Sequence, residues 1–350
     1  MKSQRVVSAI LSLLGTRSPH VRSASIITPF QSLIQSSSNS TLIAPDPRFQ
    51  IIAKFGVTDL PRISSLMNTL EFIAILAAKD YNGKISETNG PLVPGFTDVE
   101  IEIKPHSPAA TIFTKFAVLG LYYAVTTMAR ENLWKAAVFG ILWEGKHTGW
   151  IWFKPPPSSG GNQTEMQDLQ NQMQNLTGGA LSGALPGALL DLNNTSPAVL
   201  FETSSDSKNF NTSFNTSAAS ATNADFELTM SFFPQVPPLT HTHVFITVIS
   251  ALRDVAMYDI DSVVRPFQIG VEAFHCKIQW EYADGNKLGG PPSFEYKWII
   301  EAARQIPRWM LEHKFAESFF TIGVNGYVIG QGKIFSGQVP GLGMGNVTSS

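Results

Sequence analysis

Three tryptophans around one predicted hairpin are the side chains of this sequence best suited to binding a ligand. Trp143 precedes the expected turn, and Trp150 and Trp152 follow it two positions apart, so the latter two share one face of a strand. Planar indole rings stack on the apolar faces of sugars, and a row of them forms a platform for carbohydrate. Packing in a core or between modules is the simpler role for them, because indole rings bury large apolar areas and the chain has four further tryptophans. The aligned positions in the second half of the chain are Gln331 and Lys333, so the pair is specific to the first half.

Motifs typical of known catalytic and metal sites are absent from the sequence, which has no G-x-S-x-G, H-E-x-x-H or G-x-x-x-x-G-K-[ST] pattern. The single cysteine, Cys276, adjoins His275, but neighbours on a strand point to opposite faces. The two therefore cannot act as nucleophile and base, and Cys276 is expected in the core. His241 and His243 have the spacing of two metal ligands, yet no acidic residue lies near them, and they more simply begin a helix. We expect no metal and no cofactor.

Composition excludes several classes of protein. The chain has 350 residues, of which 43% are hydrophobic and 15% are charged, with a net charge of −2, so no basic stripe is present to bind nucleic acid. The longest uncharged apolar stretch, Phe116–Ala129, has fourteen residues and is too short to span a bilayer. One cysteine excludes an intramolecular disulfide.

The two halves of the chain repeat one order of elements. Residues 47–153 and 224–336 each read as strand, helix, strand, helix, strand, strand, and we call them the first and second modules. The segments that match at the two ends of the alignment are Arg48–Phe55 with Asp225–Phe232, and Val138–Gly149 with Phe319–Gly330. The offset between matching residues grows only from 177 to 181. Such a repeat predicts two similar modules packed around a pseudo-two-fold axis.

The remaining segments are predicted to be disordered. Residues 155–223 contain six charged residues and many glycines and asparagines, a composition that does not offset the entropy of ordering a chain. We expect a disordered linker over residues 154–223, a leader and disordered segment over residues 1–46, and a disordered tail over residues 337–350.

The N-terminus has features of two targeting signals. Lys2 and Arg5 precede the apolar run Val6–Gly15, which is the pattern of a signal peptide. Arg17 and Arg22 follow where a cleavage region is normally neutral, and this arginine content also suits a mitochondrial transit peptide.

Asn-x-Ser/Thr triplets favour secretion over the mitochondrion. All of them lie outside the two modules, where N-glycans are tolerated, although Ser/Thr-rich segments also produce such triplets by chance. The candidate glycosylation sites are Asn39, Asn162, Asn175, Asn193, Asn194, Asn211, Asn215 and Asn346.

The segment FGVTDLPRISSLMNTLEFIAILAAKD, Phe55–Asp80, resembles uncharacterised proteins of filamentous fungi. In those proteins a signal peptide is followed by a helix start of the form LP-R-S-x-LMN. The resemblance covers about thirty residues and implies a fungal, secreted origin, with no activity attached to it.

Together these patterns predict a two-module α+β protein, in which each module lays two helices on a four-stranded sheet and the modules pair within the chain. The expected function is that of a secreted, non-enzymatic binding or surface protein, with a carbohydrate or a cell-surface component as partner. Its site is expected at the Trp143, Trp150 and Trp152 edge or in the cleft between the modules. The alternative is a hydrolase-like enzyme with polar groups from loops 82–95 and 284–292. Ligand and oligomeric state stay open.

Overall fold

The computed structural model describes residues 26–27, 46, 48–107, 109–157, 163–178, 212–214, 225–233, 238–283 and 292–337. The expected mixed α+β architecture is confirmed, with two large sheets in which every strand pair is antiparallel. The first half contains β1 (Ile26–Ile27), β2 (Phe49–Asp59), α1 (Arg62–Ala77), β3 (Lys84–Ile85), β4 (Thr88–Asn89), β5 (Glu100–Pro105), β6 (Ile112–Phe113), α2 (Thr114–Glu131), β7 (Lys135–Trp143), β8 (Lys146–Lys154) and α3 (Gln163–Gly178). The second contains β9 (Thr212–Phe214), β10 (Phe226–Phe232), α4 (His241–Val255), β11 (Phe267–Val271), a 3-10 turn (Glu272–Phe274), β12 (Cys276–Tyr282), α5 (Tyr296–Glu312), β13 (Ser318–Val324) and β14 (Tyr327–Ser336).

The two sheets share one strand order. The first runs β1-β2-β7-β8-β5-β4, and the second, taken from its other edge, runs β9-β10-β13-β14-β12-β11. Each strand therefore has a counterpart at the same place in the chain order of the other half. The sheets have six strands, not the expected four, because the short edge strands β1, β4, β9 and β11 add to each side. These strands are only two to five residues long, which is too short for a hydrophobic pattern to reveal them.

The register of the strands also matches between the halves. In the first sheet Ile51 pairs with Ile141. Their counterparts in the second module, at offsets of 177 and 181, are Leu228 and Ile322, and these two residues also pair with each other. Both hairpins shift register at the equivalent point, after Ile141 and after Ile322. Both hairpins then turn through two residues with positive φ, Glu144-Gly145 and Asn325-Gly326, as a type I′ turn requires.

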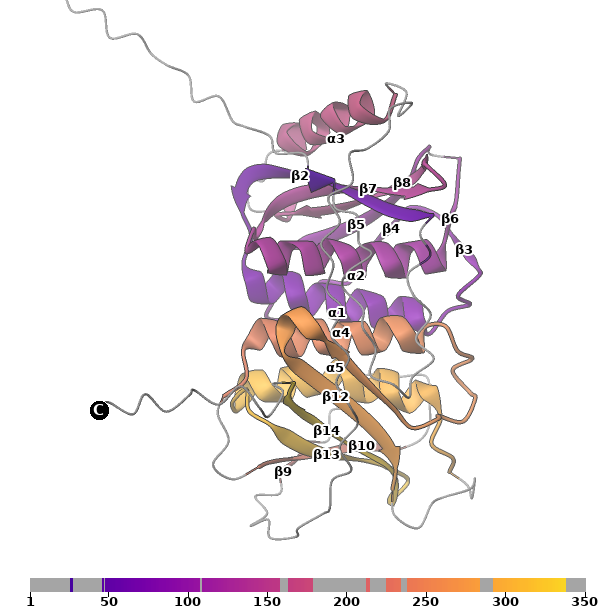
Figure 1. Cartoon of the computed structure of the whole chain (residues 1–350), viewed down its shortest axis with the longest axis vertical. Coiled ribbons are helices and arrows are strands. Elements are labelled where there is room, and N and C mark those ends of the chain that lie inside the picture. The colour runs from indigo at the N-terminus through magenta and orange to yellow at the C-terminus, as the bar shows by residue number, and fades with distance from the viewer. Residues whose placement is uncertain are drawn as a thin grey trace, which may run out of the picture.

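Four helices lie between the two sheets. α1 and α2 cover the inner face of the first sheet, α4 and α5 cover that of the second, and the two helix pairs pack against each other (Figure 1). The expected pairing of the two modules within the chain is thus confirmed. Because each helix contacts a sheet on one side and helices on the other, it needs apolar residues on more than one face. This explains why α4 is buried from Val244 to Val255.

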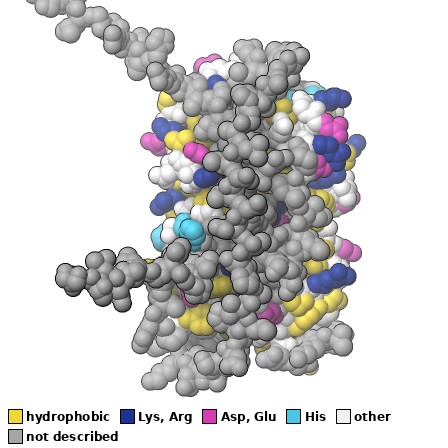
Figure 2. Space-filling view, viewed as in Figure 1, with side chains coloured by type: hydrophobic (Ala, Val, Ile, Leu, Met, Phe, Trp, Pro, Cys, Tyr) yellow, Lys and Arg dark blue, Asp and Glu magenta, His cyan; other side chains and the backbone are white. Residues whose placement is uncertain are grey.

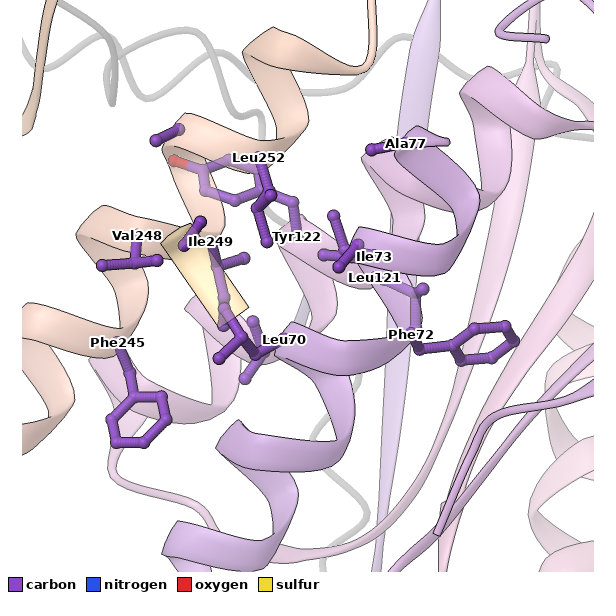
Figure 3. Close-up of a cluster of buried hydrophobic side chains, with 14 of the residues drawn as sticks. Leu70, Phe72, Ile73, Ala77, Leu121, Tyr122, Phe245, Val248, Ile249 and Leu252 are labelled. Atoms are coloured by element: carbon purple, nitrogen blue, oxygen red, sulfur yellow. The ribbon is translucent and has the colours of Figure 1, made fainter. Parts of the chain in front are cut away.

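The centre of the molecule is an apolar contact between the helix pairs. Figure 3 shows Leu70 and Ile73 of α1 facing Val248, Ile249 and Leu252 of α4. At its edge, Arg304 of α5 forms an ion pair with Glu71 of α1, with Nε 3.0 Å from Oε2. The two modules are therefore held by a continuous core that a few polar contacts border.

One helix lies where the sequence predicted disorder. α3 falls inside the expected linker of residues 154–223, and β9, in the same range, pairs with β10. The composition of the linker is polar on average, but Met166, Leu169 and Met173 recur at intervals of three and four, which is helical spacing. That local pattern, which the average composition concealed, was the signal for α3. The rest of the predicted leader, linker and tail lies outside the described residues, apart from β1, Asp46 and the first residues after β8.

Candidate functional site

The outer face of the first sheet is apolar and is covered by α3 (Figure 1). We call it the covered face and define it by residues that point away from α1 and α2, namely Ile52, Ala136, Val138, Gly140, Trp150 and Trp152. They come from β2, β7 and β8, at alternate positions as the pleat of a strand demands. The covered face forms a small hydrophobic cluster separate from the main core.

α3 presents one apolar side to this face. Met166, Leu169 and Met173 are buried against it, whereas Gln167, Asn171 and Gln172 are exposed. Gly140 leaves room for the helix, since a β-carbon there would lie 3.2 Å from the methyl carbon of Met173. α3 is thus an amphipathic helix that sits on a sheet through three apolar side chains.

A carboxylate fastens the N-terminal end of α3 to β2. Strand β2 bulges between Phe55 and Asp59, so residues 56–58 have no partners in the ladder with β7. Glu165 accepts hydrogen bonds there from the backbone N–H groups of Val57 (2.5 Å) and Thr58 (3.3 Å) and from the Thr58 hydroxyl (2.6 Å). Gly56 leaves room for this carboxylate, because a β-carbon there would lie 2.1 Å from Oε1 of Glu165 and would have to displace it. The carboxylate of Glu165 therefore accepts hydrogen bonds from bulged residues that have no partner in the ladder with β7.

Replacing Glu165 by alanine is expected to speed amide hydrogen exchange at Val57 and Thr58 by roughly 10- to 100-fold. The reason is that a hydrogen bond to a charged group contributes about 1.5–3 kcal/mol. Site-resolved hydrogen exchange measures this. Asp168→Ala removes an exposed charge from the same helix and should leave both amides unchanged. Equal protection in Glu165→Ala and wild type would show that the carboxylate does not hold α3.

Charged side chains border the covered face on the β5 and β8 side. Glu102 is buried and lies 2.8 Å from Nζ of Lys154 and 3.0 Å from Nζ of Lys104. Burial acts to raise the pKa of Glu102, but the hydrogen bonds from Lys154 and Lys104 outweigh it and hold the pKa below its ordinary value. Lys104 also lies 4.2 Å from the ring centroid of Trp152, a cation–π contact. At this border the acidic and basic side chains are paired with one another, Lys104 and Lys154 with Glu87, Glu100 and Glu102.

The structure does not bring the three predicted tryptophans together. Trp150 and Trp152 do share a face, but they are only 2% and 7% exposed beneath α3. Trp143 points to the opposite side of the sheet, where its ring centroid lies 4.9 Å from that of Phe116. The guanidinium carbon of Arg48 lies 4.4 Å from the centroid of the Trp143 ring. The three tryptophans therefore form no exposed platform, because a helix covers two of them and the third faces the other side of the sheet; they pack, which is the simpler of the two roles considered from the sequence.

The other predicted site residues lie as follows. Cys276 is buried, and burial raises its pKa to about 12, so it is an inert core thiol. His241 and His243 form the first turn of α4. In the described part of the chain no three His, Cys, Asp or Glu side chains are grouped to hold a metal. Of the candidate glycosylation sites only Asn175 lies among the described residues, in the last turns of α3, and the others lie outside them.

Next to the covered face, His147 packs against Trp150, with 3.8 Å between ring centroids. Its pKa is lowered to about 4, chiefly because the ring is buried and secondly because His106 is near, while a backbone hydrogen bond at Gly149 acts in the opposite direction. His147 is therefore harder to protonate in the folded chain than in the unfolded chain.

The free energy of unfolding is expected to fall as the pH drops from about 6.5 to about 4. Above this window His147 is neutral in both states, and below it both states are protonated, so the loss is confined to the window. Urea unfolding across pH 4–7 measures it. His147→Gln should reduce the slope, whereas replacing the exposed His106 by Gln should change it little. Burial also lowers the pKa of His243, so part of the pH dependence of the unfolding free energy should persist in His147→Gln. An identical slope in His147→Gln and wild type would contradict the assignment.

A second unusual cluster lies between the modules. Arg253 and Asp254 of α4 are both buried, and Nε of Arg253 donates to Oδ1 of Asp254 at 2.6 Å. The guanidinium lies 4.3 Å from the ring centroid of Tyr122 in α2. Burial raises the pKa of Asp254, although Arg253 acts against it. Because all three side chains are almost wholly buried, this cluster is a structural contact between modules.

Comparison of the chain with protein-family models, with curated proteins and with solved structures found no match in any of the three. None of the helices in the described residues is long and apolar enough to cross a membrane. On the side of the molecule shown in Figure 2, basic and acidic side chains are interspersed among the coloured atoms, in keeping with the small net charge of −2.

Proposed function

We propose that this chain is a non-enzymatic binding protein whose binding surface is the covered face. The observation that carries the proposal is α3 itself, an amphipathic helix laid on an apolar sheet surface through residues at helical spacing. Docking of an amphipathic helix in an apolar groove is a common mode of peptide recognition. The ligand class that this surface fits best is therefore an amphipathic helix.

Comparison with the second sheet supports a special role for this face. At the positions equivalent to Ile52, Val138, Gly140, Trp150 and Trp152, the second sheet has Thr229, Phe319, Thr321, Gln331 and Lys333. Those side chains are partly exposed. An apolar outer face is therefore not a requirement of the fold. It has been added to one sheet only.

The attachment of α3 is suited to reversible release. Two of its three buried apolar residues are methionines, which adapt to more than one packing partner. A helix of 16 residues is marginal by itself in water. Elements with few buried contacts open at a much lower free energy than the core. α3 is thus placed to act as an internal competitor for the covered face.

Two broader inferences accompany this proposal. The shared strand order, register and turns support descent of the two helix-on-sheet modules from one duplicated unit. Secretion stays a prediction, and the intact mass of the native protein before and after N-glycan removal tests it. Several lost glycans and a cleaved leader would support secretion, whereas an unglycosylated chain cut after Arg17 or Arg22 would point to the mitochondrion.

A synthetic peptide of residues 163–178 tests the binding surface. The receptor is the full chain carrying Met166→Asp, Leu169→Asp and Met173→Asp, which we call the open-face variant. We expect saturable binding of the labelled peptide, with a change in tryptophan fluorescence, because Trp150 and Trp152 line the surface. A peptide with the same three substitutions should not bind.

A matched receptor controls for charge. The full chain with Thr164→Asp, Asn171→Asp and Gln172→Asp adds the same charge at exposed positions and keeps α3 docked, so it should bind the peptide far more weakly. If the open-face variant keeps the thermal unfolding of its core and does not bind the peptide, the proposal is wrong. Binding of sugars to that variant without binding of the peptide would overturn the helix ligand and restore the carbohydrate prediction.

A further inference from the structure

We infer that the partner for the covered face is a second copy of this chain, which exchanges its α3 with the first. In the exchanged form, α3 of each copy docks on the covered face of the other and a reciprocal dimer results. This inference rests on the proposed function, because it requires that α3 leaves its own sheet.

A second copy of the chain carries α3, and α3 already fits the covered face within one chain. The contacts of Met166, Leu169 and Met173 with the covered face, and of Glu165 with Val57 and Thr58, are formed in the folded chain. Exchange reproduces each of them in trans. The balance between the closed monomer and the dimer then depends on concentration and on the connecting segments.

The connecting segments are long enough for exchange. Residues 155–162 join β8 to α3, eight residues that span at most about 26–29 Å when extended. They begin with Pro155, Pro156 and Pro157, and consecutive prolines favour an extended spacer. On the other side, 33 residues (179–211) separate α3 from β9, a reach of more than about 100 Å. α3 can therefore leave its sheet while β9 stays paired with β10.

The exposed side of α3 suits a close approach of two copies. Its exposed positions carry Gln167, Asn171, Gln172 and Gln174, with Asp168 as the single charge among them. Amide side chains both donate and accept hydrogen bonds, and Nε2 of Gln167 already donates to Oδ1 of Asn171 within α3, so this surface is polar and nearly uncharged. Since Asp168 is the single charge on the exposed side of each helix, repulsion between the two copies is small.

Only one covered face is present in the described part of the chain, because the outer face of the second sheet is mostly polar and partly exposed. Each copy therefore gives one helix and receives one helix. When two copies exchange helices with each other, both helices and both covered faces are used, so this assembly closes at two copies.

Two full-length variants test the exchange by complementation. The first is the open-face variant, which has an intact face and a disabled α3. The second carries Trp150→Gln and Trp152→Lys, which has an intact α3 and a disabled face. Gln331 and Lys333 occupy the equivalent positions of the second sheet, so these residues are compatible with the strand.

We expect each variant alone to be monomeric by light scattering and native mass spectrometry, and their mixture to form a 1:1 complex of twice the monomer mass. Wild-type copies with two different tags should likewise form mixed dimers, in a proportion that rises with concentration. The wild-type experiment needs no change in the sheet, so it decides the matter if the face variant fails to fold.

The two proposals fail in different ways. If the peptide of residues 163–178 binds the open-face variant while mixed wild-type copies stay monomeric at every concentration, exchange is refuted and the binding surface stands. If the peptide also fails to bind, the binding surface is refuted as well. A dimer that persists when α3 is disabled in both copies would place the interface elsewhere and would also refute exchange.

Discussion

Replacement of Asp254 by alanine will lower the free energy of unfolding by about 3–5 kcal/mol, the cost of leaving a buried charge without its partner. Asp254 and Arg253 are 5% and 6% exposed between the two helix pairs. Oδ2 of Asp254 and Nη1 of Arg253 have no hydrogen-bond partner among the described residues, so no neighbour is in place to replace the lost carboxylate. Urea unfolding at pH 7, with a check that the m-value is unchanged, measures the effect.

The double variant Arg253→Met, Asp254→Leu is the matched control. It removes both charges and keeps similar volume, and such replacements are neutral or stabilising by about 1–4 kcal/mol. In the first module the equivalent positions in α1 are Ala74, which is buried, and Ile75, which is 39% exposed, so the buried charged pair is specific to the second module. A cost below about 1 kcal/mol for Asp254→Ala would mean that water reaches the pair and that the modules separate more readily than the packing indicates.

Replacement of Gly332 by alanine will destabilise the second sheet by about 3 kcal/mol or more, the upper range for inserting a group in a packed core. A β-carbon there would lie 2.2 Å from the backbone oxygen of Gln279 and 2.3 Å from the ring of Phe320. The equivalent residue of the first sheet is Ile151, opposite Ile103, whereas Gly332 lies opposite Trp280. The second sheet therefore combines a large residue with glycine where the first combines two isoleucines.

Gly323→Ala provides the comparison within the same hairpin. Its β-carbon would meet no atom closer than 3.4 Å, so the smaller freedom of the unfolded chain should make this change neutral or stabilising by about 0.4–1 kcal/mol. Thermal and urea unfolding of the two variants give the difference. If Gly332→Ala lowers the free energy of unfolding no more than Gly323→Ala does, the contact between β12 and β14 relaxes easily and the prediction is wrong.

Much of the fold could be predicted from local patterns. The sequence alignment of the two modules agrees with the strand pairing. Ile51 pairs with Ile141, and the residues aligned with them, Leu228 and Ile322, pair with each other. The Asn325-Gly326 turn was also predictable, since few residues other than Asn and Gly accept positive φ at both positions. The candidate site was predictable only in part. Alternation placed Trp150 and Trp152 together, but which side of the sheet they face is not a property of the hairpin.

By itself, the sequence determined the order of the longer helices and strands, their repeat and the second hairpin turn, because strand and helix periods and turn residues act over a few neighbouring positions. Only the tertiary structure decided that α3 covers Trp150 and Trp152, that Trp143 points the other way, and that Arg253 meets Tyr122. Those contacts join residues far apart in the chain. Their energies depend on which surfaces are left to be buried once the sheets and helices have packed, and no local pattern records that.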